Sequence, residues 1–336
     1  MYAAPWAAWS AAHKQIIEHI SARSIEEFFE AVPRIGQRIG DLHAKLVSQG
    51  TLALVAYSSP ARALSHGLSQ KALVSCIHKQ SLRTLRTRMD NAEAAFQKSA
   101  SGKGVGAFLE VPRDCRWVIS DSRFKVACRR RLGLPYPAYA EPPTVAPSCT
   151  NRTLQGRVCS APCDPHGMHL ECCAPGGGLM VRHDGLVRCL GVLAARSLDP
   201  RPKLEQIIPE FARPVQGQIN EARLDVIIHD GISRLLVDVT VVSPYAGDAS
   251  FTATCARRDG HASRRAAVAK RARYPNPELV PFAVETGGRL GTDARALLAR
   301  MANAADDRHN EIQYLYRAVS SVLQDGVARQ LLTLRD

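Results

Sequence analysis

The clearest alternation of apolar and polar positions lies in residues 223–243, RLDVIIHDGISRLLVDVTVVS. Two alternating apolar runs are separated by Asp230-Gly231, a pattern that predicts a β-hairpin. With a loop over residues 230–233, Asp225 falls opposite Asp238 on the neighbouring strand. Because successive side chains of a strand point to opposite faces, the two carboxylates share one face and the other face is aliphatic. The pattern therefore predicts core on one side of the hairpin and polar chemistry on the other.

Two carboxylates opposite each other destabilise an antiparallel pair because like charges repel at that distance. A divalent cation removes the conflict, and carboxylate oxygens are suitable ligands for Mg²⁺ or Mn²⁺. Asp225 and Asp238 are therefore candidate metal ligands, and Glu205 is a candidate third carboxylate. The alternative is a wet strand face on which water or arginine balances both aspartates. The hairpin pattern alone leaves both interpretations open.

Apolar residues spaced by three and four predict helices on both sides of the hairpin. Residues 1–100 are expected to be helical, with a capping box at Ser24–Glu27 and one long helix over Lys71–Lys98. Further helices are predicted over 180–198 and 254–274 and, as an amphipathic pair covering the sheet, from residue 292 onward; strands are predicted over 204–211 and 279–286. This order indicates a mixed α+β or α/β fold with a sheet flanked by helices.

Composition and charge narrow the class of partner. The 336 residues are 46% hydrophobic and 22% charged, which is ordinary for a soluble globular protein. No apolar run approaches the roughly 20 residues of a membrane helix, and the first residues lack a secretory signal, so no membrane-spanning segment and no secretion are expected. The net charge of +13 favours a polyanion, with nucleic acid as the first candidate and an anionic membrane surface as the second.

Residues 149–173 hold five cysteines and two histidines in loop-like sequence. This density favours a metal site in a reducing compartment over a disulfide framework, and Zn²⁺ prefers four Cys or His ligands. Cys159, His169 and Cys173 are the strongest three ligands, and Cys149 is preferred as the fourth, with Cys163 as the alternative. The alternative is a group of thiols that are simply buried. The sequence therefore predicts a structural zinc site whose fourth ligand stays open.

Two basic clusters are candidate phosphate contacts. Arg129, Arg130 and Arg131 precede Leu-Gly-Leu-Pro, where they either end a helix or clamp the backbone. Arg182 and His183 lie in the first turn of the predicted helix 180–198, and a helix N-terminus favours an anion. The alternative for the second cluster is an ordinary charged first turn.

Several short blocks occur in a recognisable order: LGLP, DPHG-H, RHD, ARLDV, VDV and RYP, between about residues 100 and 330. In this order the chain resembles the C-terminal module of site-specific non-LTR retrotransposon proteins, in which a CCHC zinc knuckle precedes a restriction-like endonuclease of the PD-(D/E)XK type. The similarity is greatest to the versions found in dinoflagellate genomes. No block is specific alone, whereas their order and spacing are.

The resemblance implies four segments and a catalytic set. The segments are a helical region, 1–100, left from the link between a polymerase thumb and the endonuclease; a basic linker, 101–147; a zinc knuckle, 148–176; and the endonuclease domain with its C-terminal helices, 177–336. The family's two metal-binding aspartates fall on Asp225 and Asp238. Thr240 stands where the motif has lysine, and Lys270, four residues before Tyr274, matches a lysine that such elements carry on the following helix.

The implied activity is a Mg²⁺- or Mn²⁺-dependent nick in target DNA that primes reverse transcription. Asp225, Asp238, Lys270, Glu205 and Tyr274 are the expected catalytic residues. Arg182 and His183 match the basic pair that the family assigns to DNA, and Arg129, Arg130 and Arg131 are further candidate DNA contacts. DNA, with the element's RNA as a second candidate, is the implied partner, and the nucleus is the implied location. The chain shows no Phe/Tyr-Ala-Asp-Asp polymerase box. The alternatives are a catalytically inactive, zinc-dependent nucleic-acid-binding remnant and a stand-alone junction resolvase.

Overall fold

The computed structural model describes residues 82–83, 85–136, 148–215, 218–220, 222–245 and 248–332. The chain divides into two compact units, Met1–Met89 and Asp90–Asp336, and the second unit contains the sheet and both candidate sites. The capping box at Ser24–Glu27 and most of the predicted N-terminal helical region lie outside the described residues.

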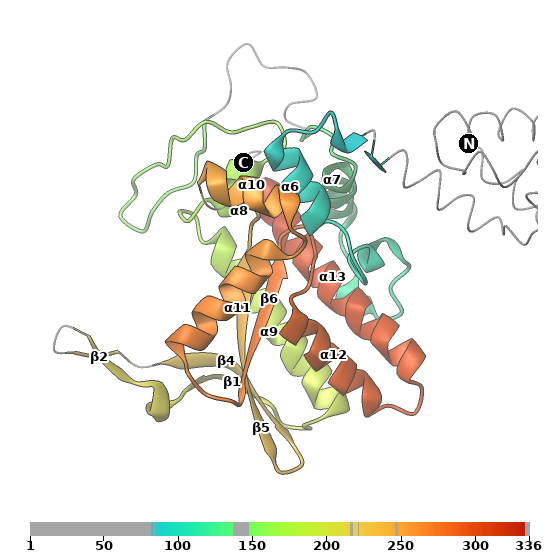
Figure 1. Ribbon diagram of the computed structural model, residues 1–336, viewed down its shortest axis with the longest axis vertical. Helices are drawn as coiled ribbons and strands as arrows, with labels where there is room; N and C mark the ends of the chain where they lie inside the picture. Colours follow the sequence, from blue (N-terminus) through green and yellow to red (C-terminus); the bar gives the residue numbers. More distant parts are fainter. Residues whose placement is uncertain are drawn as a thin grey trace, which may run out of the picture. The chain divides into compact units, whose positions relative to one another are not determined.

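Helices and strands of the second unit follow one another in the order drawn in Figure 1. They are α6 (Asn91–Ser99), η1 (Ala107–Leu109), η2 (Cys115–Trp117), α7 (Asp121–Arg131), α8 (Met168–Cys172), α9 (Gly178–Ser197), β1 (Lys203–Ile207), η4 (Pro209–Phe211), β2 (Arg213–Val215), β3 (Gln218–Asn220), β4 (Arg223–Asp230), β5 (Ser233–Val242), α10 (Ala249–Arg257), α11 (His261–Arg273), β6 (Leu279–Glu285), α12 (Thr292–Asn303) and α13 (Arg308–Leu332).

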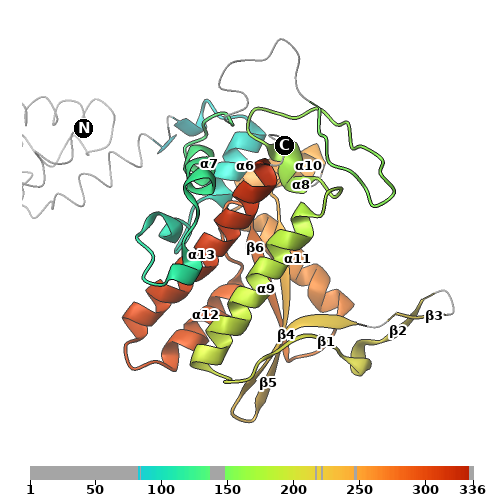
Figure 2. The same cartoon turned by 180° about the vertical axis from the view of Figure 1, so that it is seen from behind.

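Four strands form the main sheet of the described residues, in the order β1-β4-β5-β6. The β1–β4 and β4–β5 pairs are antiparallel, whereas β5 and β6 run parallel. Strands β2 and β3 form a separate two-stranded arm that projects away from the sheet (Figures 1 and 2). The predicted mixed α+β architecture, with a mixed sheet flanked by helices, is confirmed at this level.

The β4–β5 hairpin has the predicted register, and His229 pairs with Arg234. The ladder runs from Asp230 next to the turn to Val226, which faces Val237. Gly231 has φ +59°, the left-handed conformation that a tight hairpin turn requires and that glycine adopts without strain. Regular pairing therefore ends one residue before the two aspartates.

Helices cover both faces of the sheet (Figures 1 and 2). Helices α9 and α12 pack on one face, where their leucines meet Val226, Val237 and Phe282 in the main core. Helix α11 lies on the other face against β5 and β6. The C-terminal pair is found as predicted, but α13 packs against α9, α7 and α12, so it forms a layer outside the helices that touch the sheet.

Two predicted helices are interrupted by local capping. Residues 87–90 break the helix expected over Lys71–Lys98, and α6 begins anew behind Asp90. The Asp90 carboxylate accepts the Glu93 N–H at 2.8 Å and the Glu93 carboxylate accepts the Asp90 N–H at 3.0 Å. This reciprocal capping box starts a helix more strongly than the apolar spacing continues one. The helix expected over 254–274 is likewise two helices, because Gly260 adopts φ +66° between α10 and α11.

Residues 101–136, expected to belong to a basic linker, form part of the folded unit. The 3₁₀ turns η1 and η2 and helix α7 pack against α13, and Trp117 and Val126 join the main core. The Trp117 indole N–H donates to the Tyr314 hydroxyl at 3.1 Å. The linker prediction is therefore wrong for these residues, since a solvated linker does not bury tryptophan.

Candidate functional site

The carboxylates of Asp225 and Asp238 meet where β4 and β5 stop pairing. The Asp225 carboxylate Oδ2 accepts the backbone N–H of Val239 at 2.6 Å, so this side chain bonds to the neighbouring strand where the regular ladder has ended. Asp238 is 4% exposed, and its Oδ2 atom is buried with no hydrogen-bond partner among the described residues. A buried carboxylate oxygen without a donor is costly unless a cation or a proton compensates it.

Lys270 approaches Asp238 from helix α11. Its Nζ lies 2.8 Å from Asp238 Oδ1, and the lysine side chain is 25% exposed. Helix α11 thus places an ammonium group beside the second aspartate, as the resemblance implied. One oxygen of Asp238 is occupied by this ion pair, which leaves Oδ2 for another positive group.

His183 reaches the same pair from helix α9. Its Nε2 lies 3.3 Å from Asp225 Oδ2, and its Nδ1 lies 3.1 Å from Asp184 Oδ1. The His183 side chain is partly exposed, as are those of Lys270 and Asp184. The site is therefore open to solvent beside the buried Asp238 and the partly buried Asp225, and groups from α9, β4, β5 and α11 converge on it.

The surroundings of the two aspartates shift their pKa values in opposite directions. Burial, opposed in part by Lys270 and reinforced by the charge of Asp225, raises the pKa of Asp238 to about 6. The pKa of Asp225 is lowered although burial opposes this, because His183 and the Val239 N–H stabilise the charged form. Bonding to Asp225 raises the pKa of His183, since two carboxylates favour the imidazolium form in which both ring nitrogens donate.

The remaining predicted catalytic residues lie at the edge of this cluster or away from it. The β1–β4 register places Glu205 beside Asp225, but its backbone has φ +54° and its carboxylate pairs with Arg223. Tyr274 is 5% exposed and packs against Phe211 at 5.1 Å between ring centroids, so it belongs to a second apolar cluster. Within the described part of the chain, neither residue therefore forms a hydrogen bond or an ion pair with the two aspartates.

Thr240, which the resemblance sets at the lysine position of the motif, shares the α11 side of β5 with Asp238, two residues earlier. Its hydroxyl is buried and has no hydrogen-bond partner within the described part of the chain. A hydroxyl cannot supply the positive charge of a lysine, so Lys270 is the ammonium group at this site.

The arginine cluster before Leu-Gly-Leu-Pro clamps the backbone. Arg129 donates to the Pro135 carbonyl at 3.0 Å, Arg130 donates to the Thr286 carbonyl at 3.2 Å, and Arg131 donates to the Ala100 carbonyl. Arg130 is also 8% exposed. These contacts bear out the backbone clamp, and the same three arginines also form the last turn of α7, as the other alternative expected. Because their guanidinium groups are engaged by backbone carbonyls of the fold, the DNA-binding prediction for this cluster is not supported.

Arg182 is also a structural residue. It is 3% exposed, and its Nη1 donates to the Glu171 carbonyl at 3.3 Å and to Gln330 Oε1 at 3.1 Å. Burial lowers its pKa to about 10. The prediction that Arg182 contacts DNA is therefore wrong, because its guanidinium joins α8, α9 and α13 inside the fold.

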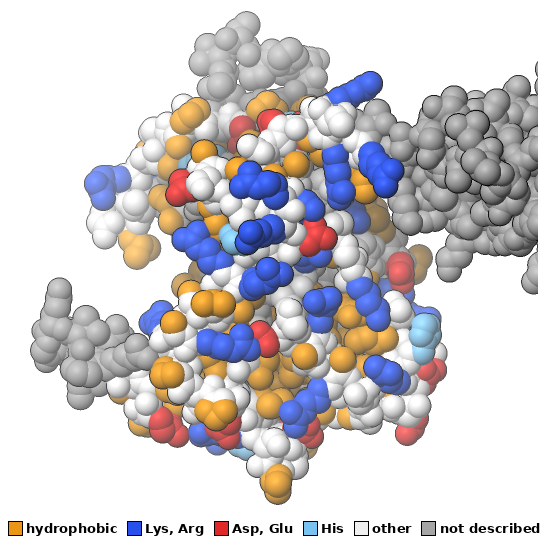
Figure 3. All heavy atoms as spheres, viewed as in Figure 1, with side chains coloured by type: hydrophobic (Ala, Val, Ile, Leu, Met, Phe, Trp, Pro, Cys, Tyr) orange, Lys and Arg blue, Asp and Glu red, His pale blue; other side chains and the backbone are white. Residues whose placement is uncertain are grey.

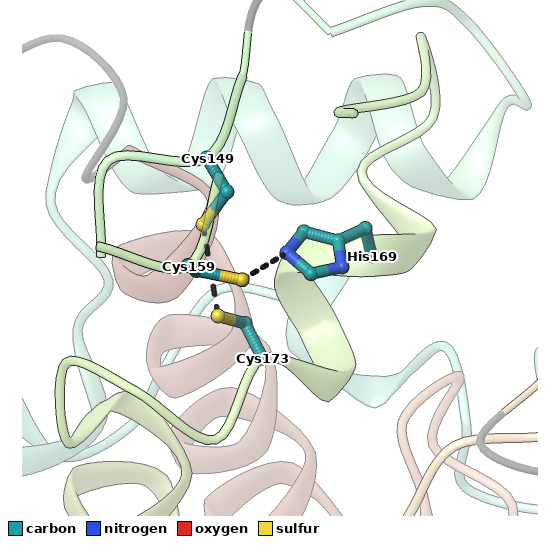
Figure 4. Close-up of side chains that lie close together, drawn as sticks. All are labelled: Cys149, Cys159, His169 and Cys173. Atoms are coloured by element: carbon teal, nitrogen blue, oxygen red, sulfur yellow. Dashed lines mark hydrogen bonds between the residues drawn. The ribbon is translucent and has the colours of Figure 1, made fainter. Parts of the chain in front are cut away.

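Cys149, Cys159, His169 and Cys173 converge on one point (Figure 4). Their ligand atoms lie within 4.8 Å of one another, with 3.6 Å between Cys149 Sγ and Cys173 Sγ and 3.5 Å between Cys159 Sγ and His169 Nε2. Tetrahedral zinc with Zn–S bonds of about 2.3 Å needs sulfurs roughly 3.8 Å apart. The cluster can therefore hold a zinc ion, and Cys149 rather than Cys163 is its fourth member.

Local hydrogen bonds explain how this cluster forms. Cys149 donates its N–H to Ala161, and Cys159 donates its N–H to Asn151, so a small hairpin closes the wide spacing between the first two cysteines. The Asp164 carboxylate accepts the N–H groups of His166, Met168 and His169 at 2.9–3.0 Å. That turn starts α8 in the direction that presents His169 to the three sulfurs.

The thiols differ in their readiness to ionise. Burial raises the pKa of Cys173 to about 12 and also raises that of Cys149, whereas the Ala161 N–H lowers the pKa of Cys159. Thiolates, not thiols, ligate zinc, so the energy of metal binding has to offset the burial of the first two. Two buried sulfurs and a partly buried one facing a single imidazole suit a closed, structural site.

Basic side chains gather on the face that carries α10 and α11 (Figure 3). Helix α11, HASRRAAVAKRAR, contains no acidic residue. Arg271 pairs with Asp293 at 2.6 Å, whereas Arg257, Arg258 and Arg264 are exposed and have no ion-pair partner among the described residues. The helix that carries Lys270 to the aspartates therefore also carries an exposed positive face.

No protein-family model matches the chain, and neither curated proteins nor solved structures show a match. Among the described residues, none of the helices combines the length and the apolar character needed to cross a membrane.

Proposed function

We propose that the chain is a divalent-metal-dependent DNA endonuclease of the restriction-like type, derived from a retrotransposon protein and acting in the nucleus by nicking target DNA. The observation that carries the proposal is the Asp238 carboxylate, buried beside Asp225 with one oxygen on Lys270 and the other without a donor among the described residues. Two carboxylates and an ammonium group in one partly open site suit phosphodiester hydrolysis.

Asp225, Asp238 and Lys270 would have different roles in the reaction. Asp225 and Asp238 would hold Mg²⁺ or Mn²⁺, whose bound form polarises a phosphate and lowers the pKa of a water molecule. Lys270 is partly exposed, so its ammonium group can approach a phosphate oxygen and stabilise the negative charge that develops there. The low-dielectric setting of Asp238 strengthens each of these interactions.

Charge supports DNA as the partner. The chain carries a net charge of +13, and exposed arginines lie on α10 and on α11, the helix that brings Lys270 to the aspartates. Phosphate contacts of this kind position a duplex without reading its sequence. The Cys₃His cluster would hold Zn²⁺ as a structural ion, and its cysteines are packed into the same core as the sheet.

A plasmid-nicking assay with Mg²⁺ or Mn²⁺ tests the proposal. Wild-type protein should convert supercoiled to open-circular plasmid, and Asp238→Asn should lower the rate by at least about 100-fold, since it removes a metal-binding charge without changing shape. Asp230→Asn is the matched control, because Asp230 lies on the same hairpin and pairs with Arg300 at the surface. Nicking that survives Asp238→Asn, or that needs no divalent cation, contradicts the proposal.

A second candidate function is a zinc-dependent nucleic-acid-binding protein without cleavage. The replacement of the motif's lysine by Thr240 favours this candidate, because the strand itself then supplies no positive charge. Lys270 is the only ammonium group that the described residues bring to the aspartates. This candidate predicts salt-dependent DNA binding by wild type and Asp238→Asn alike, with no nicking by either.

A further inference from the structure

The imidazole of His183 lies between two carboxylates. Nε2 faces Asp225 Oδ2 at 3.3 Å and Nδ1 faces Asp184 Oδ1 at 3.1 Å. The sequence predicted that His183 meets phosphate at a helix N-terminus, but His183 is the sixth residue of α9 and points at a metal-ligand candidate. An imidazole that contacts a ligand carboxylate through one nitrogen can control how that carboxylate is turned.

We infer that His183 is a positioning residue of the aspartate site: it fixes the rotation of the Asp225 carboxylate, and Asp184 fixes the orientation of the imidazole. The inference rests on the proposed function, since it concerns the way Asp225 is presented to a divalent cation. It adds a role for a residue that is neither a metal ligand nor a phosphate contact.

The hydrogen bonds to Asp225 support this role. Its Oδ2 accepts from the Val239 backbone N–H at 2.6 Å and faces His183 Nε2, so two donors from different elements hold the same oxygen. Rotation of the carboxylate would break both contacts. Oδ1 is therefore the atom left for a cation or for the adjoining Asp238 carboxyl.

The base of His183 is held rigidly, which a positioning residue requires. The neighbouring Arg182 is buried and bonds to the Glu171 carbonyl and to Gln330. Gly326 on α13 lies so close that an added Cβ would sit 3.0 Å from the Arg182 side chain. Movement of the His183 backbone away from Asp225 would therefore require movement of α9 against α13.

The test compares Mn²⁺ binding by the full-length, zinc-loaded wild type and variants, measured by isothermal titration or by the Mn²⁺ spin-resonance signal. Loss of an outer-shell partner typically weakens metal affinity about 10- to 100-fold, and that is the range expected for His183→Ala. His183→Gln should recover most of the affinity, because its amide can donate where Nε2 does. The Mn²⁺ affinity of Asp184→Asn should lie between those of His183→Ala and His183→Gln. His309 is an exposed residue of α13, so His309→Ala should bind Mn²⁺ as tightly as the wild type does.

Zinc content and the thermal midpoint of each variant report separately on folding. If His183→Ala and the wild type bind Mn²⁺ equally, or if His183→Gln is as weak as His183→Ala, the inference is overturned while the proposed function stands. If wild-type protein and Asp238→Asn both bind no Mn²⁺, the proposed function fails and the inference fails with it. Weak binding by His183→Ala with recovery in His183→Gln supports the positioning role, since a general loss of structure would not be rescued by one donor.

Discussion

Glu171 offers the sharpest test of how the Cys/His segment is joined to the sheet-containing unit. Its side chain is 1% exposed, and its carboxylate pairs with Arg130 Nε, whose side chain is 7% exposed. The Glu171 backbone carbonyl meanwhile accepts from Arg182. Two buried guanidinium groups therefore depend on this one residue of α8, which lies between the zinc-ligand candidates His169 and Cys173.

Replacing Glu171 by glutamine keeps the shape of the side chain and removes its charge. Breaking a buried ion pair by neutralising one partner costs about 3–5 kcal/mol, because the other charge stays buried without compensation. We expect Glu171→Gln to lower the free energy of unfolding by an amount in this range. Asp230→Asn removes the exposed pair with Arg300, whose side chains are 30% and 41% exposed, and should cost no more than about 1 kcal/mol.

Urea unfolding of the zinc-loaded full chain, followed by circular dichroism, measures both changes, with zinc content determined in parallel. A double variant with Glu171→Leu and Arg130→Met should regain much of the lost stability, since apolar groups of similar volume often replace a buried pair without loss. If Glu171→Gln is no less stable than Asp230→Asn, the buried ion pair between Glu171 and Arg130 does not stabilise the packing of α8 against the rest of the unit, and the reasoning is refuted.

The remaining predictions concern the two sites and the basic face. Cys149→Ser should lower bound zinc to under about half an equivalent per chain by mass spectrometry, whereas Cys163→Ser should keep it; equal losses would contradict the ligand set. Because a carboxylate must lose its proton to bind a cation, Mn²⁺ affinity should fall as the pH drops through the Asp238 pKa of about 6. An affinity unchanged on either side of that pH would argue against Asp238 as a ligand. Replacing Arg257 and Arg264 by alanine should reduce the slope of log Kd against log salt for duplex DNA by about 2, measured by fluorescence anisotropy; an unchanged slope would remove α10 and α11 from the DNA-binding face.

Patterns that depend on neighbouring residues were readable from the sequence. Alternation around Asp230-Gly231 determined the hairpin register, because a one-residue slip would turn every apolar side chain to the wrong face. The apolar spacing of residues 180–198 likewise predicted α9. The long helix over Lys71–Lys98 was wrong although its correction was visible, since Asp90 and Glu93 have the spacing of a capping box.

Choices between equivalent residues were left to the tertiary structure. Cys149 and Cys163 are both plausible ligands by spacing, and the hairpin between residues 148 and 162 brings Cys149 to the other sulfurs. Arg182 and His183 are adjacent and were assigned one role, but Arg182 turns toward Gln330, 148 residues later, while His183 turns toward Asp225. No local signal distinguishes them.

By itself, therefore, the sequence determined the four strands of the main sheet, helix α9, the hairpin register and three of the four cluster residues, because these follow from periodicity, turn chemistry and ligand type within short stretches. The lysine on α11 was implied by the family resemblance. Only the tertiary structure decided which arginines are buried, which cysteine completes the cluster and which residue supports Asp225. Burial and partner choice depend on which segments distant in the chain pack together. Helix α13 meets α7, α8 and α9 through contacts that no short window of sequence contains.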